Sequence, residues 1–224
     1  MRKTQRNLMI CAMIFGVSLV IANVITAKTV QTGIPLFGGT IMIPCAVIAY
    51  PVTFLMTDVI SELWGPKEAR TVVFVGFGCQ LLSLVYILIA QVLPPGDADM
   101  QSAYDMLLGQ NAMFVLGSMT AYLLSQSWDV FFFHKIRSHF VSEGDAPSGK
   151  RWIWNNASTM TSQIIDTVVF ISIGFGIGFG WFFDSAMLPT VFAMMIGQYL
   201  IKLVIAAIDT PIFYALTRKG RAEA

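Results

Sequence analysis

The chain has 224 residues, of which 56% are hydrophobic and only 12% charged, and its mean hydropathy is +0.70. A soluble domain usually carries about 25% charged residues. This composition therefore excludes an ordinary water-soluble protein and indicates one that lies in a lipid bilayer. The net charge of +1 argues against a nucleic-acid partner held by a strongly basic surface.

Six apolar runs are long enough to cross a bilayer, which takes roughly 20 residues. They predict an all-α integral membrane protein whose residues 1–224 form a single six-helix transmembrane domain. Pro44 and Pro51 interrupt the second run and Pro211 the sixth, and we expect each to break the helix where protein or water can satisfy the freed backbone groups. The expected spans are residues 8–27, 41–63, 70–93, 111–133, 155–181 and 187–216, each to within several residues.

The first run carries a polar residue, Asn23, in mid-span. A basic start followed by an apolar stretch also matches a secretory signal peptide. However, a small-residue cleavage site is poor here, and cleavage would leave only five spans. A first transmembrane helix is therefore the favoured interpretation.

The second run keeps two acids, Asp58 and Glu62, four residues apart and so on one helix face. Placing a charge at the bilayer centre costs about 2.5–3.5 kcal/mol, so this face is not expected to meet lipid. Either the acids line the inner end of a substrate cavity or they join the second span to its neighbours. For Glu62, pairing with Lys67 or Arg70 at the membrane interface is a further alternative.

The connections between runs predict the orientation. If the chain starts in the cytoplasm, the outer segments hold one basic residue, Lys28, and the 94–110 loop holds three Asp and no Lys or Arg. Twelve basic residues then lie inside, which fits the positive-inside rule with both termini cytoplasmic. These are Arg2, Lys3, Arg6, Lys67, Arg70, Lys135, Arg137, Lys150, Arg151, Arg218, Lys219 and Arg221.

Polar stripes mark the last two runs. Gln163 and Asp166 are three residues apart, and Gln198 and Lys202 four apart, with Asp209 two turns beyond Lys202. At about 1.5 Å per residue, Asp166 lies roughly 16 Å into the fifth span and Lys202 about 22 Å into the sixth, both near the midplane. A binding or coupling role is favoured for them, and the alternative is a structural Asp–Lys pair that locks the two spans together. Amides accompany these charges throughout the predicted spans: Asn23, Gln80, Gln126, Asn155, Asn156, Gln163 and Gln198.

No catalytic or metal-binding pattern is found. Cys11, Cys45 and Cys79 lie in apolar runs without a CxxC pair, and we expect small buried side chains. His134 and His139 lack acids or cysteines at metal-ligand spacing, and no hydrolase nucleophile motif occurs. The sequence therefore predicts a protein that is not an enzyme and has no cofactor or metal.

A glycine-rich stretch, "ISIGFGIGFG", contains two small-residue ridges, Gly174-x-x-x-Gly178 and Gly176-x-x-x-Gly180. Such ridges let helices approach closely in membranes. The stretch matches no phosphate-binding loop, so it predicts helix packing.

Three segments resemble the queuosine precursor transporter family, in the vitamin-uptake-transporter group: "ANVITAKTV", "YPVTFLMTDVISELWGPKEAR" and "WNNASTMTSQIIDTVVF". The resemblance covers nearly the whole chain. It implies a fold like the substrate-binding subunits of energy-coupling-factor transporters. It also implies uptake of 7-cyano-7-deazaguanine and 7-aminomethyl-7-deazaguanine across the bacterial inner membrane, for queuosine modification of tRNA.

The polar and aromatic side chains of the predicted spans could bind such a ligand. A carboxylate accepts the adjacent N–H groups of the heterocycle, amides or a lysine serve its carbonyl, and aromatic rings stack on its plane. For an aminomethyl ligand, Asp58 or Glu62 is a ready counter-charge. The candidate substrate-binding residues are Asn23, Asp58, Glu62, Asn156, Gln163, Asp166, Gln198, Lys202 and Asp209.

Two other functions stay open at this point. One is a substrate-binding subunit of an ATP-driven vitamin importer, since the chain has no nucleotide-binding motif of its own. The other is a membrane assembly factor or enzyme that transports nothing. The expected partners are a small molecule and the bilayer, and a homodimer is compatible with the sequence. Three driving forces stay open: facilitated diffusion with trapping inside the cell, proton coupling through a carboxylate, and docking to a separate energy module.

Overall fold

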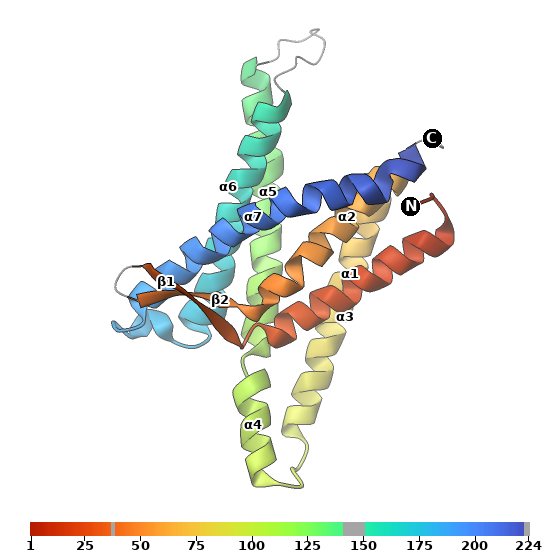
Figure 1. Cartoon of the computed structure of the whole chain (residues 1–224). Helices are drawn as coiled ribbons and strands as arrows, with labels where there is room; N and C mark the ends of the chain where they lie inside the picture. Colours follow the sequence, from red (N-terminus) through yellow and green to blue (C-terminus); the bar gives the residue numbers. More distant parts are fainter. Residues whose placement is uncertain (37–38, 141–150, 222–224) are drawn as a thin grey trace.

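A computed structural model describes residues 1–36, 39–140 and 151–221 (Figure 1). The described chain is mostly helical. Its elements, in order, are α1 (Gln5–Ile25), β1 (Thr29–Leu36), β2 (Gly39–Pro44), the short η1 (Cys45–Ile48), α2 (Tyr50–Trp64), α3 (Pro66–Val92), α4 (Ala98–Leu108), α5 (Asn111–Phe140), α6 (Arg151–Ile171), the π-helical η2 (Ser172–Ile177), η3 (Trp181–Phe183) and α7 (Leu188–Arg221).

Six helical segments are long and apolar enough to cross a membrane, which confirms the predicted number for the described ranges. They carry large apolar side chains on their outer faces, such as Met13 at 70% exposure and Phe74 at 63%. Lipid can cover these faces, because its tails are as apolar as the side chains. The segments are Gln5–Ile25, Cys45–Trp64, Pro66–Val92, Ala98–Ser125, Met160–Ile177 and Leu188–Ile205.

The prediction of an all-α protein is wrong between α1 and α2, where an antiparallel hairpin forms. Thr29 pairs with Pro44, and Leu36 with Gly39, so residues 41–44 belong to β2 and not to the second span. The segment is rich in β-branched residues, which favour strands, and Gly33 takes a φ of 74° that other residues rarely adopt. Hydropathy alone could not separate this apolar strand from the start of a helix.

The prolines of the second run also act differently from the prediction. Pro44 ends β2, and Pro51 lies in the first turn of α2, where a missing N–H removes no helical hydrogen bond. Both prolines therefore delimit the helix and neither breaks it. Pro211 does lie inside α7.

The segment expected as an outer loop, residues 94–110, contains the helix α4. The Asp97 side chain caps it by accepting a hydrogen bond from the Met100 N–H at 2.9 Å. Tyr104 donates to the Ile87 carbonyl at 3.0 Å and ties α4 to α3. The cap is readable in the sequence, but the helix is short and weakly apolar, so it does not stand out as a span.

The helices pack into two clusters of buried side chains, one formed by α1, α2 and α3 and the other by α5, α6, η2 and α7. In the second cluster, α5 and α6 lie side by side (Figure 1). A Cβ at Gly174 would lie 3.0 Å from the Phe114 ring, and one at Gly178 would lie 3.0 Å from Met113. These contacts confirm the predicted helix packing for the Gly174–Gly178 ridge. Gly176 instead meets the Phe182 ring, and Gly180 lies beyond the helix with a φ of 69°.

The N-terminus lies close to the last turns of α7. The terminal amino group of Met1 donates a hydrogen bond to the Leu216 carbonyl near the end of α7. The start of α1 therefore lies at the same end of the molecule as the last turns of α7 (Figure 1). An even number of spans requires this arrangement, whichever side of the membrane the ends occupy.

Candidate functional site

A cavity of about 340 Å³ lies between the two packed clusters. Its walls come from α1, α2 and α3 on one side and from α5 and α6 on the other. This volume is at the small end of the roughly 300–1,000 Å³ found for small-molecule sites. The cavity is therefore large enough for one compact ligand.

One face of α2 forms the longest wall. Its lining residues recur at helical spacing and run from one end of the helix almost to the other, which at about 1.5 Å per residue makes a wall roughly 16 Å long. Four of the six carry a hydroxyl group, so the wall offers donors and acceptors along its length. The six are Tyr50, Thr53, Phe54, Thr57, Asp58 and Ser61.

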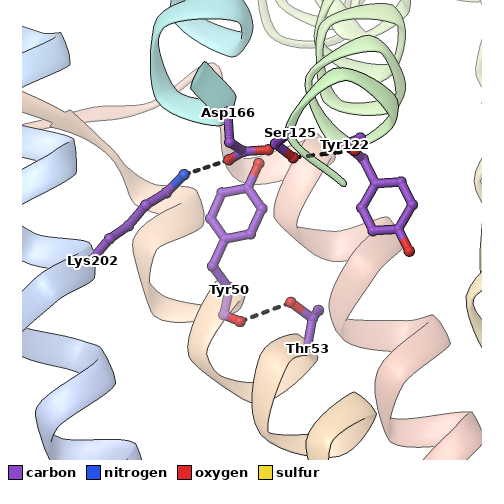
Figure 2. Close-up of polar contacts among 6 residues, drawn as sticks. All are labelled: Tyr50, Thr53, Tyr122, Ser125, Asp166 and Lys202. Carbon is purple, nitrogen blue, oxygen red and sulfur yellow. Dashed lines mark hydrogen bonds and ion pairs between the residues drawn. The ribbon is translucent and has the colours of Figure 1, made fainter. Parts of the chain in front are cut away.

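The deep end of the cavity carries Asp166, for which the sequence favoured a binding role. Asp166 lines the cavity from α6, and its Oδ2 accepts a hydrogen bond from Lys202 Nζ on α7 at 2.5 Å (Figure 2). The side chains are 23% and 9% exposed, respectively. A buried charge of either sign is stable only when it is paired. Asp166 and Lys202 therefore stabilise each other inside the membrane-spanning region.

Lys202 stands behind the cavity wall. It is not among the lining residues, whereas its partner Asp166 and the neighbouring Tyr50 are. Its Nζ lies 5.9 Å from the centroid of the Tyr50 ring, within the range of a cation–π contact. Figure 2 shows Tyr50 pointing from α2 toward Asp166. Lys202 thus contacts two lining residues at once and connects α7 to both α6 and α2.

Aromatic rings complete the deep part of the cavity. Tyr50 meets Phe170 edge-on, with ring centroids 6.3 Å apart, and Tyr122 meets Phe77 edge-on at 5.0 Å. All four residues line the cavity. Such rings provide apolar faces on which a flat heterocycle can stack.

The other end of the cavity is open and charged. Asp58 and Ser61 from α2 and Arg70 from α3 line it, and all three are exposed. They lie near the junction of α2 and α3, on the side of the molecule that holds the N-terminus and the last turns of α7 (Figure 1). The cavity therefore opens at this end.

The structure places four of the predicted site residues away from the cavity lining. Glu62 is exposed on α2, and Asn23 is buried and donates to Gln80 Oε1 at 3.2 Å. The side-chain oxygens of Gln163 and Gln198 are buried and have no hydrogen-bond partner in the described structure. Of the seven predicted residues whose side chains the structure describes, only Asp58 and Asp166 line the cavity.

Two predicted residues lie where only the backbone is described. Asn156 belongs to α6 and Asp209 to α7, but their side chains are outside the described part of the structure. Their predicted roles stay predictions.

Several lining residues were not predicted from the sequence, although a signal for some of them was there. Tyr50, Thr53, Thr57 and Ser61 recur at helical spacing beside Asp58, which is a polar stripe in an apolar helix. Arg70 was considered only as an inner basic residue and as a partner of Glu62. Nothing in the sequence of α3 or α5 marks their lining residues, because both helices are apolar on nearly all sides.

The remaining chemistry-bearing residues do not gather into a second site. Within the described residues, no group of three His, Cys, Asp or Glu side chains is close enough together to hold a metal ion. Cys11 and Cys45 are buried as predicted, but Cys79 is exposed on α3, so the prediction of a buried side chain is wrong there. Lipid can cover that face, since Cys79 lies inside a membrane-spanning segment.

Comparison with known proteins indicates a transporter. The sequence profile of the family described as "Putative vitamin uptake transporter" matches residues 44–216. The chain belongs to this family. A relative from Bacillus subtilis (strain 168), named "Probable queuosine precursor transporter", is 33% identical over 202 residues, which cover 89% of this chain and 80% of that protein. No solved structure matches significantly.

As a member of this family, the protein is a multi-pass membrane protein with a transporter role. Six apolar helices and a cavity between them are what such a role requires. The cavity carries charged groups at two places, the paired carboxylate at its deep end and the charged open end.

Proposed function

We propose that this protein imports 7-deazaguanine precursors of queuosine, such as 7-cyano-7-deazaguanine and 7-aminomethyl-7-deazaguanine. The printed name of the Bacillus subtilis relative supports this substrate class. The observation that carries the proposal is the Asp166 carboxylate, held by Lys202 at the deep end of a cavity walled by Tyr50, Tyr122, Phe77 and Phe170.

The chemistry of the ligand matches this end of the cavity. A deazaguanine is flat and presents an N–H and an amino group side by side, and a carboxylate can accept both. Lys202 occupies one carboxylate oxygen, Oδ2, and both oxygens of a carboxylate can accept more than one hydrogen bond. The aromatic side chains then stack on the heterocycle while Asp166 accepts hydrogen bonds from its N–H and amino groups.

The proposed membrane orientation puts both chain ends in the cytoplasm and the α4 segment outside the bacterial inner membrane. The distribution of basic residues supports it. In that orientation the open end of the cavity faces the cytoplasm. The protein does no chemistry on its ligand and needs no cofactor in this proposal.

Uptake of a labelled deazaguanine tests the proposal directly. We expect cells that cannot make the base to accumulate it only when they carry this gene, and Asp166→Asn to reduce uptake at least tenfold at equal protein level. Glu62→Gln is the matched control for Asp166→Asn. It also neutralises a predicted acid of a membrane-spanning helix, but Glu62 does not line the cavity. Uptake that persists in the Asp166→Asn variant would contradict the assigned site.

Reconstitution separates this function from its two rivals. The purified protein should move the ligand across proteoliposome membranes by itself. A strict need for a co-purifying ATPase would indicate the binding subunit of an ATP-driven importer. Failure to move any ligand in either setting would favour an assembly factor.

A further inference from the structure

The cavity is open at one end and sealed at the other. Along α2 the lining runs from Tyr50 at the sealed end to Ser61 at the open end, and along α3 it runs the opposite way, from Phe77 to Arg70. One turn beyond the sealed end, the next residues on the surrounding helices are almost fully buried. These include Asn23, Ala46, Gln80, Phe114 and Phe175, each at most 1% exposed.

Most of this sealing layer is apolar, but two of its members are amides that face each other. Asn23 lies one turn beyond the lining residue Leu19 on α1, and Gln80 lies one turn beyond Phe77 on α3. Asn23 Nδ2 donates to Gln80 Oε1 at 3.2 Å and to the Leu19 carbonyl at 3.2 Å. We call this pair the amide latch.

The amide latch is incompletely satisfied. Asn23 Oδ1 and Gln80 Nε2 are buried and have no hydrogen-bond partner in the described structure. Nearly all buried polar atoms in proteins are paired, and an unpaired one costs free energy. Two unpaired atoms in the layer that closes the cavity make the closed arrangement less favourable than an apolar seal would be.

The position of the amide latch links this cost to transport. A substrate that enters from the α4 end must cross the sealing layer to reach Asp166. If α1 and α3 part there, water or the passing heterocycle can bond to the spare acceptor and donor. The open arrangement then gains the hydrogen bonds that the closed one lacks, so the two arrangements stay close in free energy.

We propose that the amide latch is the gate between the cavity and the α4 end of the protein, and that it opens by separation of α1 from α3 at Asn23 and Gln80. This rests on the proposed transport function. It also gives Asn23 a role in the passage of substrate in place of a role in the cavity itself.

The competing reading is that the two amides are only a structural contact between helices. The Asn23→Leu/Gln80→Leu double variant separates the readings. It removes both partners at once and replaces them with apolar groups of similar size, which leaves no unpaired atom behind and need not destabilise the fold. An apolar seal should hold the gate shut while leaving the cavity and its open end intact.

We expect the purified double variant to bind 7-cyano-7-deazaguanine within twofold of the wild-type affinity, and its uptake rate in cells to fall at least tenfold. The Asn111→Leu variant, which removes a buried amide of α5 outside the latch, should keep wild-type uptake. Unchanged uptake in the double variant, or equal losses of binding and uptake, would overturn the proposal.

A labelling experiment tests the gate without using any substrate. In a cysteine-free background, the Ser118→Cys variant places a thiol in the cavity wall, and the Ser102→Cys variant marks the α4 side. A small charged methanethiosulfonate reagent is applied to each face of the membrane in turn. From the α4 side, we expect the cavity thiol to react at least tenfold more slowly in the double-leucine background, with no change from the other side.

Equal rates from the α4 side in both backgrounds would overturn the gate. If the wild-type protein neither binds nor imports a deazaguanine, the proposed substrate fails, but the labelling rates still decide whether the amide latch controls access. The two failures are therefore distinguishable.

Discussion

Replacing Lys202 with methionine isolates the electrostatics at the deep end of the cavity. The variant leaves the Asp166 carboxylate, 23% exposed, without the ammonium group that now lies 2.5 Å away. Removing one partner of a buried ion pair costs about 3–5 kcal/mol, because an uncompensated charge remains. Since Asp166 keeps some access to the cavity, we expect the lower end of that range, about 3 kcal/mol.

The double variant Asp166→Asn/Lys202→Met removes both charges and should recover most of this loss. Pairs that are in contact typically show interaction energies of about 0.5–3 kcal/mol in a double-mutant cycle, and we expect the upper end, about 3 kcal/mol, for this one. Uptake should not recover, because the carboxylate that accepts the ligand's N–H groups is absent. Within the wild type, the two single variants and the double variant, the double variant should thus regain stability without regaining transport.

Denaturant unfolding in detergent micelles gives the stabilities, and uptake of labelled 7-cyano-7-deazaguanine gives the activities. Additive losses, within about 0.5 kcal/mol, would show that the two side chains do not interact and would refute the ion pair. Restored uptake in the double variant would refute the role of Asp166 in ligand binding. A Lys202→Arg variant should stay folded and partly active, since it keeps a cation at the same place.

Three further outcomes follow from the positions of single residues. Asp58→Asn should weaken uptake of the cationic 7-aminomethyl ligand about fivefold more than uptake of the neutral 7-cyano ligand, because a partly exposed charge pair contributes up to about 1 kcal/mol. Competition between the two ligands for uptake measures this difference. Equal losses for the two ligands would argue against contact between ligand and Asp58 at the open end. Gly174→Ala should destabilise the fold by about 1–3 kcal/mol, because its Cβ would lie 3.0 Å from the buried Phe114 ring. Gly78→Ala, where a Cβ meets nothing within 4 Å, should cause no loss of stability in the same unfolding assay.

The number of membrane spans could be read from the sequence because insertion depends on local hydropathy. Each of the six predicted runs overlaps a helical segment that is long and apolar enough to cross a membrane, and no tertiary contact is needed to recognise one. The deep charges could be recognised for the same reason. Asp166 and Lys202 stand out in their apolar spans, and the alternative of a pair between them is what the structure contains.

The sequence did not determine where the cavity is. The sequence favoured a binding or coupling role for Asp166 and Lys202 in the last two spans, but no described side chain of α7 lines the cavity, and most of the wall comes from α1, α2, α3 and α5. Which face of a helix meets which neighbour depends on the rotation and crossing of all helices together. A periodic pattern within one helix carries no information about that arrangement.

The sequence by itself determined that this protein lies in a lipid bilayer, how many spans it has, and which charged side chains must be shielded from lipid. Only the tertiary structure decided that residues 29–36 and 39–44 pair as strands, that Lys202 lies outside the cavity lining, and that Asn23 contacts Gln80 at the sealed end of the cavity. The physical reason is the range of the interactions. Transfer into lipid acts on each segment alone, whereas strand pairing, ion pairing and a closed cavity need partners that are distant in the chain.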